Sequence, residues 1–524
     1  MNSRSATRDA WLLAGLLMLL AAVSLARPLL PIDETRYAAV AWEMWDRGSF
    51  LVPLRNGEAY HHKPPLLFWL MHAGWAVFGV NEWWPRQISP LFAAGTLALT
   101  AALGRRLWPQ RPLVARAAPF VLLASALYAY FATALMFDAM LAFFVALGLL
   151  GIVVAWQDGG ARGFVWLALG LGGALYAKGP VALLHLMPVA LFAPWWMREQ
   201  RPSHWRRWYA GVGLALLGGA ALILAWAVPA GIAGGPEYRN AIFWGQTAGR
   251  MASSFAHRAP WWFYVAWLPV MLAPWLLWPR WWQGLRRGLL DESGARLLLL
   301  TLSVTFIAFS LISGKRWHYL LPQFVPFALL CARALDGSRA NRLAKAVPGV
   351  ALIGIGIAAI AAAPRAAAGL GDAGARLPLW AAGAFTIVAG LALLRRPLSD
   401  ALTEARTVAV AMLLSLSAFF IAGDLLLREP YDVSRAAQQI AHDQAAGRPV
   451  AIIGDYHGQW HLAGRLHQPL VEIGAGELDA WLAKNPNGRV LLIHRRADDL
   501  PGGKRVVFEQ PRYRGGRLAI IGAD

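Results

Sequence analysis

The chain has 524 residues, of which 58% are hydrophobic and 15% charged, and its formal net charge is +20. This composition departs strongly from that of soluble globular proteins and places the chain in a membrane. The basic residues alternate with apolar segments instead of forming one patch, which argues against nucleic acid as a partner. The single cysteine, Cys331, excludes an internal disulfide and a cysteine-based metal site.

Apolar segments recur along the chain at close to the ~20 residues that cross a bilayer. About thirteen spans are predicted, near residues 11–30, 87–107, 112–131, 139–156, 163–178, 180–197, 209–230, 260–279, 296–313, 319–336, 346–363, 378–394 and 407–427. Arginine-rich connections follow every second span, and short basic loops are cytoplasmic. The N-terminus is therefore predicted inside, with the first loop (31–86) and the C-terminal tail outside.

We predict a polytopic α-helical membrane domain over residues 1–428 and a separate external domain over 429–524. In the tail, strands are expected at 449–455, 470–473, 489–494, 506–509 and 518–521, with a helix at 476–484 and a weaker one at 459–466. This alternation indicates a small α/β domain. The turn from Gly454 to Gly458 lacks the spacing of a dinucleotide fingerprint, so we interpret the domain as accessory.

The first external loop carries the densest charge in the chain, between residues 33 and 63. Ionisable residues held between membrane segments indicate a functional site. Asp33 and Glu34 stand where the first segment leaves the bilayer, and Asp138 stands at the outer mouth of a later one, among apolar neighbours. Burying Asp138 without a partner would cost several kcal/mol, so we expect it to meet Lys63, Arg36 or a substrate.

Lysine is scarce, because only six of the 49 Lys+Arg residues are lysines. Three of them, Lys63, Lys178 and Lys315, fall at predicted outer ends of membrane segments. An ammonium group binds phosphate as a point charge, so these lysines, with Arg36 and Arg316, predict an anion site at the membrane surface. The alternative is that each lysine is an interfacial anchor. In an anion site, a carboxylate would act as general base or orient the attacking oxygen while lysines stabilise a departing phosphate.

Four histidines, His61, His62, His257 and His318, are also predicted on the outer side. Imidazole together with a carboxylate suits a divalent metal such as zinc or manganese. The sequence has no HExxH motif, and histidines that only hydrogen-bond are the alternative. No nucleotide-binding loop is present, so no nucleotide cofactor is expected.

The first-loop sequence Asp33-Glu34-Thr35-Arg36-Tyr37, followed by Glu43-Met44 and Lys63-Pro64-Pro65, resembles that of bacterial lipid A aminoarabinose transferases. These are polyprenyl-phosphate-sugar-dependent enzymes of the GT-C class, similar to protein O-mannosyltransferases. The likeness continues through Phe137-Asp138, Lys178-Gly179-Pro180 and residues 315–319, and covers most of residues 8–430. It implies about thirteen helices, juxtamembrane helices in the first loop and a periplasmic C-terminal α/β domain.

Carried over by position, the resemblance makes Asp33 and Asp138 the catalytic aspartates. The residues that it places around the polyprenyl phosphate are Arg36, Tyr37, Tyr60, Lys63 and Tyr319. By their charge we add Glu34, Lys178 and Lys315 to the substrate-binding residues. His62 stands where the aminoarabinose enzymes usually have glutamate, and with His257 it would form the metal site. The departure bears on which sugar is transferred, because neutral histidine reads a cationic amino sugar less well than a carboxylate does.

The predicted function is inverting transfer of a sugar from an undecaprenyl-phosphate donor to lipid A or a related envelope glycolipid, on the periplasmic face of the bacterial inner membrane. The alternatives are a protein or glycan O-glycosyltransferase of the same class, a lipid or solute transporter, and a membrane subunit without chemistry. A transporter predicts inverted repeats and charges at the midplane, whereas these charges cluster at the outer mouth. A subunit without chemistry would tolerate Asp33→Asn and Lys63→Ala.

Overall fold

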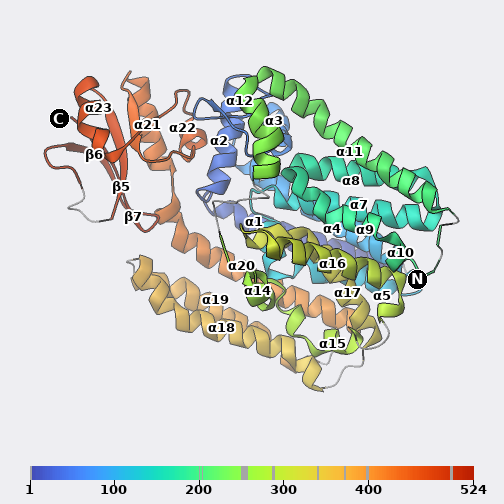
Figure 1. Cartoon of the computed structure of the whole chain (residues 1–524). Coiled ribbons are helices and arrows are strands. Elements are labelled where there is room, and N and C mark those ends of the chain that lie inside the picture. The colour runs from blue at the N-terminus through green and yellow to red at the C-terminus, as the bar shows by residue number, and fades with distance from the viewer. Residues whose placement is uncertain are drawn as a thin grey trace.

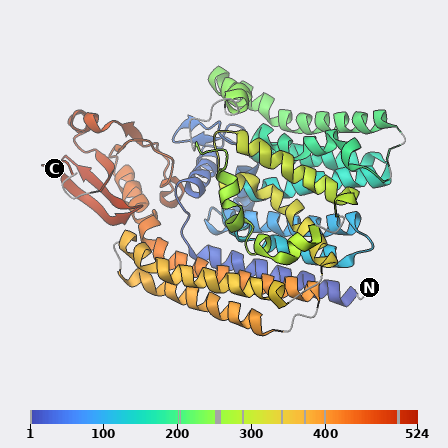
Figure 2. The ribbon, with the colours of Figure 1, turned by 60° about the horizontal axis from the view of Figure 1, so that its bottom comes forward.

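The computed structural model describes residues 3–199, 201–202, 204–249, 258–285, 289–338, 342–370, 373–396, 400–495 and 500–523. In this part of the chain a bundle of helices is followed by a small mixed domain (Figure 1). The N-terminus and the C-terminal domain lie toward opposite ends of the bundle in both views (Figures 1 and 2).

Nine helical stretches of the described residues are long and apolar enough to cross a bilayer, by length and composition. The helices that form them or their larger part are α1 (Ser3–Ala26), α4 (Trp83–Leu107), α7 (Asp138–Asp158), α8 (Ala161–Lys178), α11 (Trp205–Ala233), α16 (Ser293–Leu311), α18 (Arg342–Leu370), α19 (Arg376–Arg395) and α20 (Ala401–Tyr431). The protein is therefore a polytopic α-helical membrane protein, as predicted.

Four of the predicted spans are broken. Their pieces are α5 (Pro112–Leu123), α6 (Ala126–Phe131), η1 (Gly179–Ala182), α9 (Leu183–Leu191), α10 (Ala193–Trp196), α14 (Phe263–Met271), η3 (Trp275–Leu277), α15 (Pro279–Leu285), η5 (Trp317–Gln323) and α17 (Phe324–Gly337). Pro194, Pro274 and Pro322 stand at three of the breaks, because proline lacks the amide that continues a helix. The fourth lies at Ser125, whose backbone is extended. The count of thirteen is therefore not confirmed.

Small residues let the membrane helices approach closely. A Cβ on Gly151 of α7 would lie 2.5 Å from the Leu167 amide of α8, and α18 meets α19 in the same way at Gly356 and Gly383. Such contacts are common between helices inside a bilayer. Figure 2 shows α1 alongside α20, with α18 and α19 next to them, so the first and last helices form one layer. Short turns complete the bundle: α12 (Gly235–Asn240), η2 (Ala241–Gly249), η4 (Leu289–Asp291) and η6 (Ala373–Ala375).

The segment between α1 and α4, which the sequence predicts as the first external loop, is folded. It contains α2 (Asp33–Asp46), a hairpin of β1 (Leu54–Arg55) and β2 (Glu58–Ala59), and α3 (Leu66–Phe78). Ala38, Val40 and Met44 of α2 are fully buried, so this helix packs into the protein instead of lying in solvent. The two helices match the juxtamembrane helices that the family resemblance implies.

The C-terminal domain is an α/β unit. Its elements are α21 (Ser434–Ala445), β3 (Val450–Ile453), α22 (His461–Gly464), β4 (Val471–Ile473), η7 (Ala475–Glu477), α23 (Leu478–Lys484), β5 (Arg489–His494), β6 (Arg505–Tyr513) and β7 (Gly516–Gly522). The five strands lie in the order β4-β3-β5-β7-β6, with β3 parallel to β4 and β5. All five predicted strands are present, whereas α21 was not predicted. Val433, which precedes it, and Ala436, Ala437 and Ile440 within it have the helical spacing that would have revealed it.

Both faces of this sheet are covered. Val450 and Ile452 of β3 pack with the α21 side, and Ala451 between them packs with Leu478 and Leu482 of α23. The alternation follows from the two-residue period of a strand. The domain lies at the same end of the bundle as the first external loop, with α22 beside α2 (Figure 1).

Candidate active site

Glu34 fastens the beginning of α2 to two other segments. Its carboxylate accepts hydrogen bonds from both terminal nitrogens of Arg27 at 2.5 and 2.6 Å, and from the amides of Leu30 and Leu135 at 2.8 Å. Burial favours the neutral acid, but the Arg27 guanidinium and the hydrogen bonds hold the pKa of Glu34 below its ordinary value. Four donors occupy both oxygens, so Glu34 positions the start of α2, and its predicted substrate contact stays a prediction.

Asp33 is the more accessible carboxylate at the start of α2. It forms an ion pair with Arg36 one turn later, and its side chain remains 42% exposed. The Arg36 guanidinium also lies 5.5 Å from the centre of the Tyr37 ring. Asp33 therefore has the accessibility that a general base or an orienting group requires.

Asp138 and Lys178 form a buried ion pair. Asp138 is the first residue of α7 and Lys178 the last of α8, and the lysine ammonium donates to Asp138 Oδ1. Each charge suits its helix end, because a helix dipole favours anions at the N-terminus and cations at the C-terminus. The ammonium also lies 4.5 Å from the centre of the Tyr319 ring, which fixes it from the other side.

Phe137 joins the first loop to this pair. Its ring packs edge-on against Tyr37 and Phe68, with centroids 4.9 and 5.7 Å away. Lys63 Nζ lies 5.9 Å from the same ring. The next residue is Asp138, which Lys63 is close enough to influence electrostatically. The Phe137 ring thus lies close to both α2, which begins with Asp33, and Lys63, and it directly precedes Asp138 of the ion pair.

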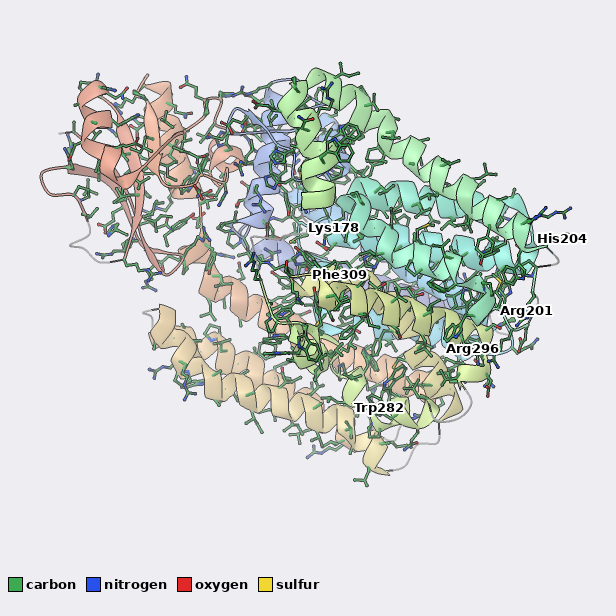
Figure 3. All side chains as sticks on the ribbon, in the orientation of Figure 1. Lys178, Arg201, His204, Trp282, Arg296 and Phe309 are labelled. Carbon is green, nitrogen blue, oxygen red and sulfur yellow. The ribbon has the colours of Figure 1, made fainter. Side chains whose placement is uncertain are left out.

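A cavity of about 330 Å³, which we call the lysine cavity, opens beside this cluster. Lys63, Lys178, His62 and Tyr319 are among its polar lining residues, and most of the remaining wall is apolar, including Leu141, Leu175, Ile223, Leu224, Ala227 and Phe309. Lys178 and Phe309 approach it from α8 and α16, whereas Arg201, His204 and Arg296 gather at the opposite end of the bundle (Figure 3). Cations in the wall of a mostly apolar cavity suit a lipid with an anionic headgroup.

A second and larger cavity, of about 810 Å³, is lined by Lys315, Arg316, Trp317 and His318, which directly precede Tyr319, and we call it the aromatic cavity. Its polar lining residues are Asp33, Glu34, Arg258, Lys315, Arg316 and His318. Trp267 and Trp317 also line it, with ring centroids 4.9 Å apart. Burial lowers the pKa of His318 to about 4, so its imidazole is neutral near pH 7. Aromatic rings with cationic side chains suit a substrate that has both ring faces and anionic groups.

Lys315 lies apart from the other two predicted lysines. It lines the aromatic cavity, and its ammonium donates to the carbonyls of Ala259 at 2.9 Å and Ile312 at 2.6 Å. These bonds hold two chain segments together, so the three lysines do not form one phosphate site. Lys63 and Lys178 alone line the same cavity.

The predicted metal site stays a prediction. His62 stacks on Tyr60 and on His61, with ring centroids 5.2 and 4.5 Å away. His257 lies outside the described residues. Within the described part of the chain, no group of three His, Cys, Asp or Glu side chains has the geometry to hold a metal ion.

Arg27 is a functional residue that the sequence reasoning missed. It is the basic partner of Glu34 and lies at the predicted outer end of the first apolar segment. Its position could have indicated a specific partner, because the positive-inside rule does not account for an arginine at the outer end of a membrane segment. The partnership of Asp138 with Lys178 was also missed, because 40 residues of helix separate them in the chain.

The sequence is similar to that of glycosyltransferases that use lipid-linked sugars. The family model for dolichyl-phosphate-mannose-protein mannosyltransferases matches residues 24–230, which include Asp33, Lys63, Asp138 and Lys178. The matched residues make up less than half of the chain and span the first loop and the helices α4, α7 and α8.

Individual sequence relatives indicate which kind of glycosyltransferase the chain resembles. The chain is 34% identical over 316 residues to an undecaprenyl phosphate-alpha-4-amino-4-deoxy-L-arabinose arabinosyl transferase of Pseudomonas fluorescens, covering 58% of this chain and 55% of the relative. It is 31% identical over 339 residues to the transferase of the same name in Pseudomonas aeruginosa, covering 63% and 60%. The chain thus matches little more than half of the length of these relatives.

Two solved structures have the same fold as this chain over nearly its whole length. ArnT from Cupriavidus metallidurans bound to undecaprenyl phosphate superimposes with a TM-score of 0.76 at 20% identity, covering 98% of this chain and 97% of ArnT. Its apo state gives 0.78 at 19% identity, covering 99% and 98%. The present chain therefore shares the fold of ArnT, including the C-terminal domain.

Proposed function

We propose that this protein is an inverting glycosyltransferase that moves a sugar from undecaprenyl phosphate to an envelope acceptor, with lipid A the favoured acceptor. The observation that carries the proposal is the lysine cavity, where Lys63 and Lys178 both line a mostly apolar pocket. A polyprenyl phosphate matches both the lysines and the apolar wall, because cations bind its phosphate and apolar side chains pack against its hydrocarbon chain. The names of the sequence relatives, which use undecaprenyl phosphate carrying an amino sugar, support the same donor.

The two cavities suggest a division between donor and acceptor. The donor phosphate binds at Lys63 in the lysine cavity, and the acceptor enters the aromatic cavity, where Asp33, Arg258 and Arg316 line the wall. The sugar then lies between the cavities, near Tyr319 and the Asp138–Lys178 pair. An acceptor with sugar rings and phosphate groups, such as lipid A, suits aromatic and basic walls better than an uncharged one.

The reaction proposed is a single displacement. An acceptor oxygen attacks the anomeric carbon, the bond between that carbon and the phosphate oxygen breaks, and the electron pair remains on undecaprenyl phosphate. Lys63 stabilises the charge that develops on the leaving phosphate. A phosphate acceptor is already ionised and needs no base, whereas for a hydroxyl acceptor Asp33 takes the proton. Inversion follows because attack and departure occur on opposite faces.

The proposed location is the bacterial inner membrane, with the N-terminus in the cytoplasm and the C-terminal domain in the periplasm. Arg106, Arg111 and Arg116 form ion pairs at the end of the bundle that is remote from the first loop. Short basic connections of this kind face the cytoplasm. An external site also agrees with a lipid-linked donor and with the expectation that no nucleotide is used.

The test is transfer by the purified full-length protein in lipid nanodiscs. Radiolabelled undecaprenyl-phosphate-aminoarabinose is supplied with lipid A, and undecaprenyl-phosphate-mannose with lipid A or with acceptor peptides in parallel. Label in lipid A, abolished by Asp33→Asn and by Lys63→Ala, is the expected result. Label only in peptides would assign a protein acceptor instead. No transfer from any donor would refute a glycosyltransferase.

A further inference from the structure

The hairpin before Tyr60 and Lys63 is too short to hold its own shape. β1 and β2 have two residues each, and the turn residues Asn56 and Gly57 have φ angles of 53° and 85°. Left-handed angles at both positions are those of a type I′ turn, for which Asn-Gly is a favoured pair. An isolated two-stranded hairpin is at best marginally stable in water. Contacts from outside the hairpin therefore fix the segment that leads to Lys63.

Glu43 of α2 supplies the first of these contacts. Its carboxylate accepts hydrogen bonds from the backbone amides of both turn residues, Asn56 and Gly57, the latter at 2.9 Å. The side chain is 3% exposed, and burial raises the pKa of its carboxyl although both hydrogen bonds lower it. One buried carboxylate thus ties the helix that begins with Asp33 to the turn before Lys63.

The C-terminal domain supplies the second contact, at the same turn. Asn56 Nδ2 donates to the Leu470 carbonyl at 2.9 Å, and the Leu470 amide donates to Asn56 Oδ1 at 2.8 Å. A Cβ placed on Gly57 would lie 3.6 Å from Pro469 Cβ. The turn is therefore held on one side by α2 and on the other by the chain just before β4.

The domain also reaches the Glu43 carboxylate itself. His461 Nε2 lies 3.4 Å from Glu43 Oε1, and His461 Nδ1 is 2.6 Å from the Tyr456 hydroxyl. Burial lowers the pKa of His461 to about 3, so the imidazole is neutral near pH 7. A neutral ring satisfies both neighbours when Tyr456 donates to Nδ1 and Nε2–H faces Glu43.

Further contacts hold the C-terminal half of α2. Trp42 Nε1 donates to the Leu466 carbonyl at 2.9 Å, and the Arg465 guanidinium lies 5.4 Å from the Trp42 ring centre. His467 Nδ1 lies 2.8 Å from Asp46 Oδ1. The C-terminal domain therefore contacts the C-terminal half of α2, whereas Asp33 at the N-terminus of α2 lines the aromatic cavity.

We propose that the C-terminal α/β domain is a positioning part of the active site, with Glu43 and Asn56 as the positioning residues that set α2 relative to the Tyr60–Lys63 segment. The inference rests on the proposed function and deepens it. Asp33 and Arg36 lie on α2, whereas Tyr60 and Lys63 follow the hairpin, so the two halves of the site are placed by one shared junction. A misplacement of about 1 Å at a reacting centre costs on the order of 10²-fold in rate.

The test variant is Asn56→Gly in the full-length protein in nanodiscs. Glycine keeps the left-handed turn and removes only the two side-chain bonds to Leu470. The matched control is Asp479→Asn, on α23 of the same domain, where the carboxylate is 83% exposed and pairs with Lys504. The readouts are hydrogen exchange over residues 54–63, affinity for undecaprenyl phosphate, and kcat and KM of sugar transfer.

Asn56→Gly is expected to speed amide exchange over residues 54–63 and to lower kcat at least tenfold, with a melting temperature close to that of the wild type. The control should match the wild type in every readout. A second pair of substitutions, Gly57→Cys with Pro469→Cys, allows a rescue, because the 3.6 Å Cβ separation lies in the disulfide range. In the Asn56→Gly background, oxidation of this pair should restore kcat relative to the same protein reduced.

Two results would overturn the proposal. One is unchanged kcat and undecaprenyl-phosphate affinity despite faster exchange, which would make the interface purely structural. The other is unchanged exchange, which would remove the domain as the support of the hairpin. A wild type that transfers no sugar refutes the proposed function separately, and the positioning contact is then decided by exchange and undecaprenyl-phosphate affinity alone.

Discussion

Lys178 and Asp138 pair across the ends of two neighbouring helices, and both are buried. The lysine ammonium donates to Asp138 Oδ1, and the two side chains are 10% and 2% exposed. Removing one partner of such a pair strands the other charge, whereas removing both leaves two neutral groups. The pair therefore supports the bundle beside the lysine cavity, which Lys178 lines.

We predict that Lys178→Met and Asp138→Asn each lower the apparent free energy of unfolding by about 3 kcal/mol. The double variant should lose clearly less free energy of unfolding than the two single variants together, because neither charge is left without its partner. Denaturation of the four proteins in one detergent measures this cycle. Additive losses would mean that the two side chains do not stabilise each other.

Lys63 should control donor affinity. Loss of a hydrogen bond to a charged group costs about 1.5–3 kcal/mol, so Lys63→Ala is expected to weaken undecaprenyl-phosphate binding by about 10- to 150-fold. Lys63→Arg keeps the charge and should lose less. Titration of nanodisc-bound protein with undecaprenyl phosphate gives the affinities. The control is Lys484→Ala, an exposed lysine in the C-terminal domain. Equal affinities of Lys63→Ala and wild type would exclude Lys63 from the phosphate site.

Asp33→Asn should separate the two acceptor chemistries. If the acceptor is a hydroxyl, loss of the general base is expected to lower kcat by about 10²–10⁴-fold. If the acceptor is a phosphate, the loss should be smaller, because no proton is removed. Donor affinity should change little in both cases, since Asp33 lines the aromatic cavity and not the lysine cavity. A large loss of donor affinity would contradict this division.

The sequence predicted the architecture well where composition alone decides it. In the described part of the chain, nine long apolar helical stretches and the five strands of the terminal domain lie where the patterns place them. It failed where proline or an extended residue interrupts an apolar run, because hydropathy does not register a missing amide at Pro274 or an extended backbone at Ser125.

For the site, the sequence indicated the kinds of charge but not their partners. Asp138 was expected to meet Lys63 or Arg36, and the structure pairs it with Lys178 because α7 and α8 pack closely through glycines. Lys315 was expected at the phosphate, yet backbone carbonyls hold it. Such choices depend on helix packing. The contact between Glu43 and His461 joins segments that no local pattern connects.

His461 should make the docking of the C-terminal domain dependent on pH. Burial, together with the charge of Arg47, lowers the pKa of His461 to about 3, below the unfolded value of about 6.5. Between these values the unfolded state binds a proton that the folded state does not, so stability falls as the pH falls from about 6.5 toward 3. Glu43 has a raised pKa and acts in the opposite direction.

Because the two groups act in opposite directions, the test compares the pH dependence of variants with that of the wild type. His461→Gln removes the titrating ring, and His442→Gln removes an exposed histidine of α21 as a control. Exchange of the Leu470 amide, followed in each full-length protein from pH 7.5 to pH 5 after correction for intrinsic rates, reports the docked state. The wild type and His442→Gln should lose protection together as the pH falls, and His461→Gln should lose less. Parallel curves for all three proteins would refute a buried neutral imidazole at this interface.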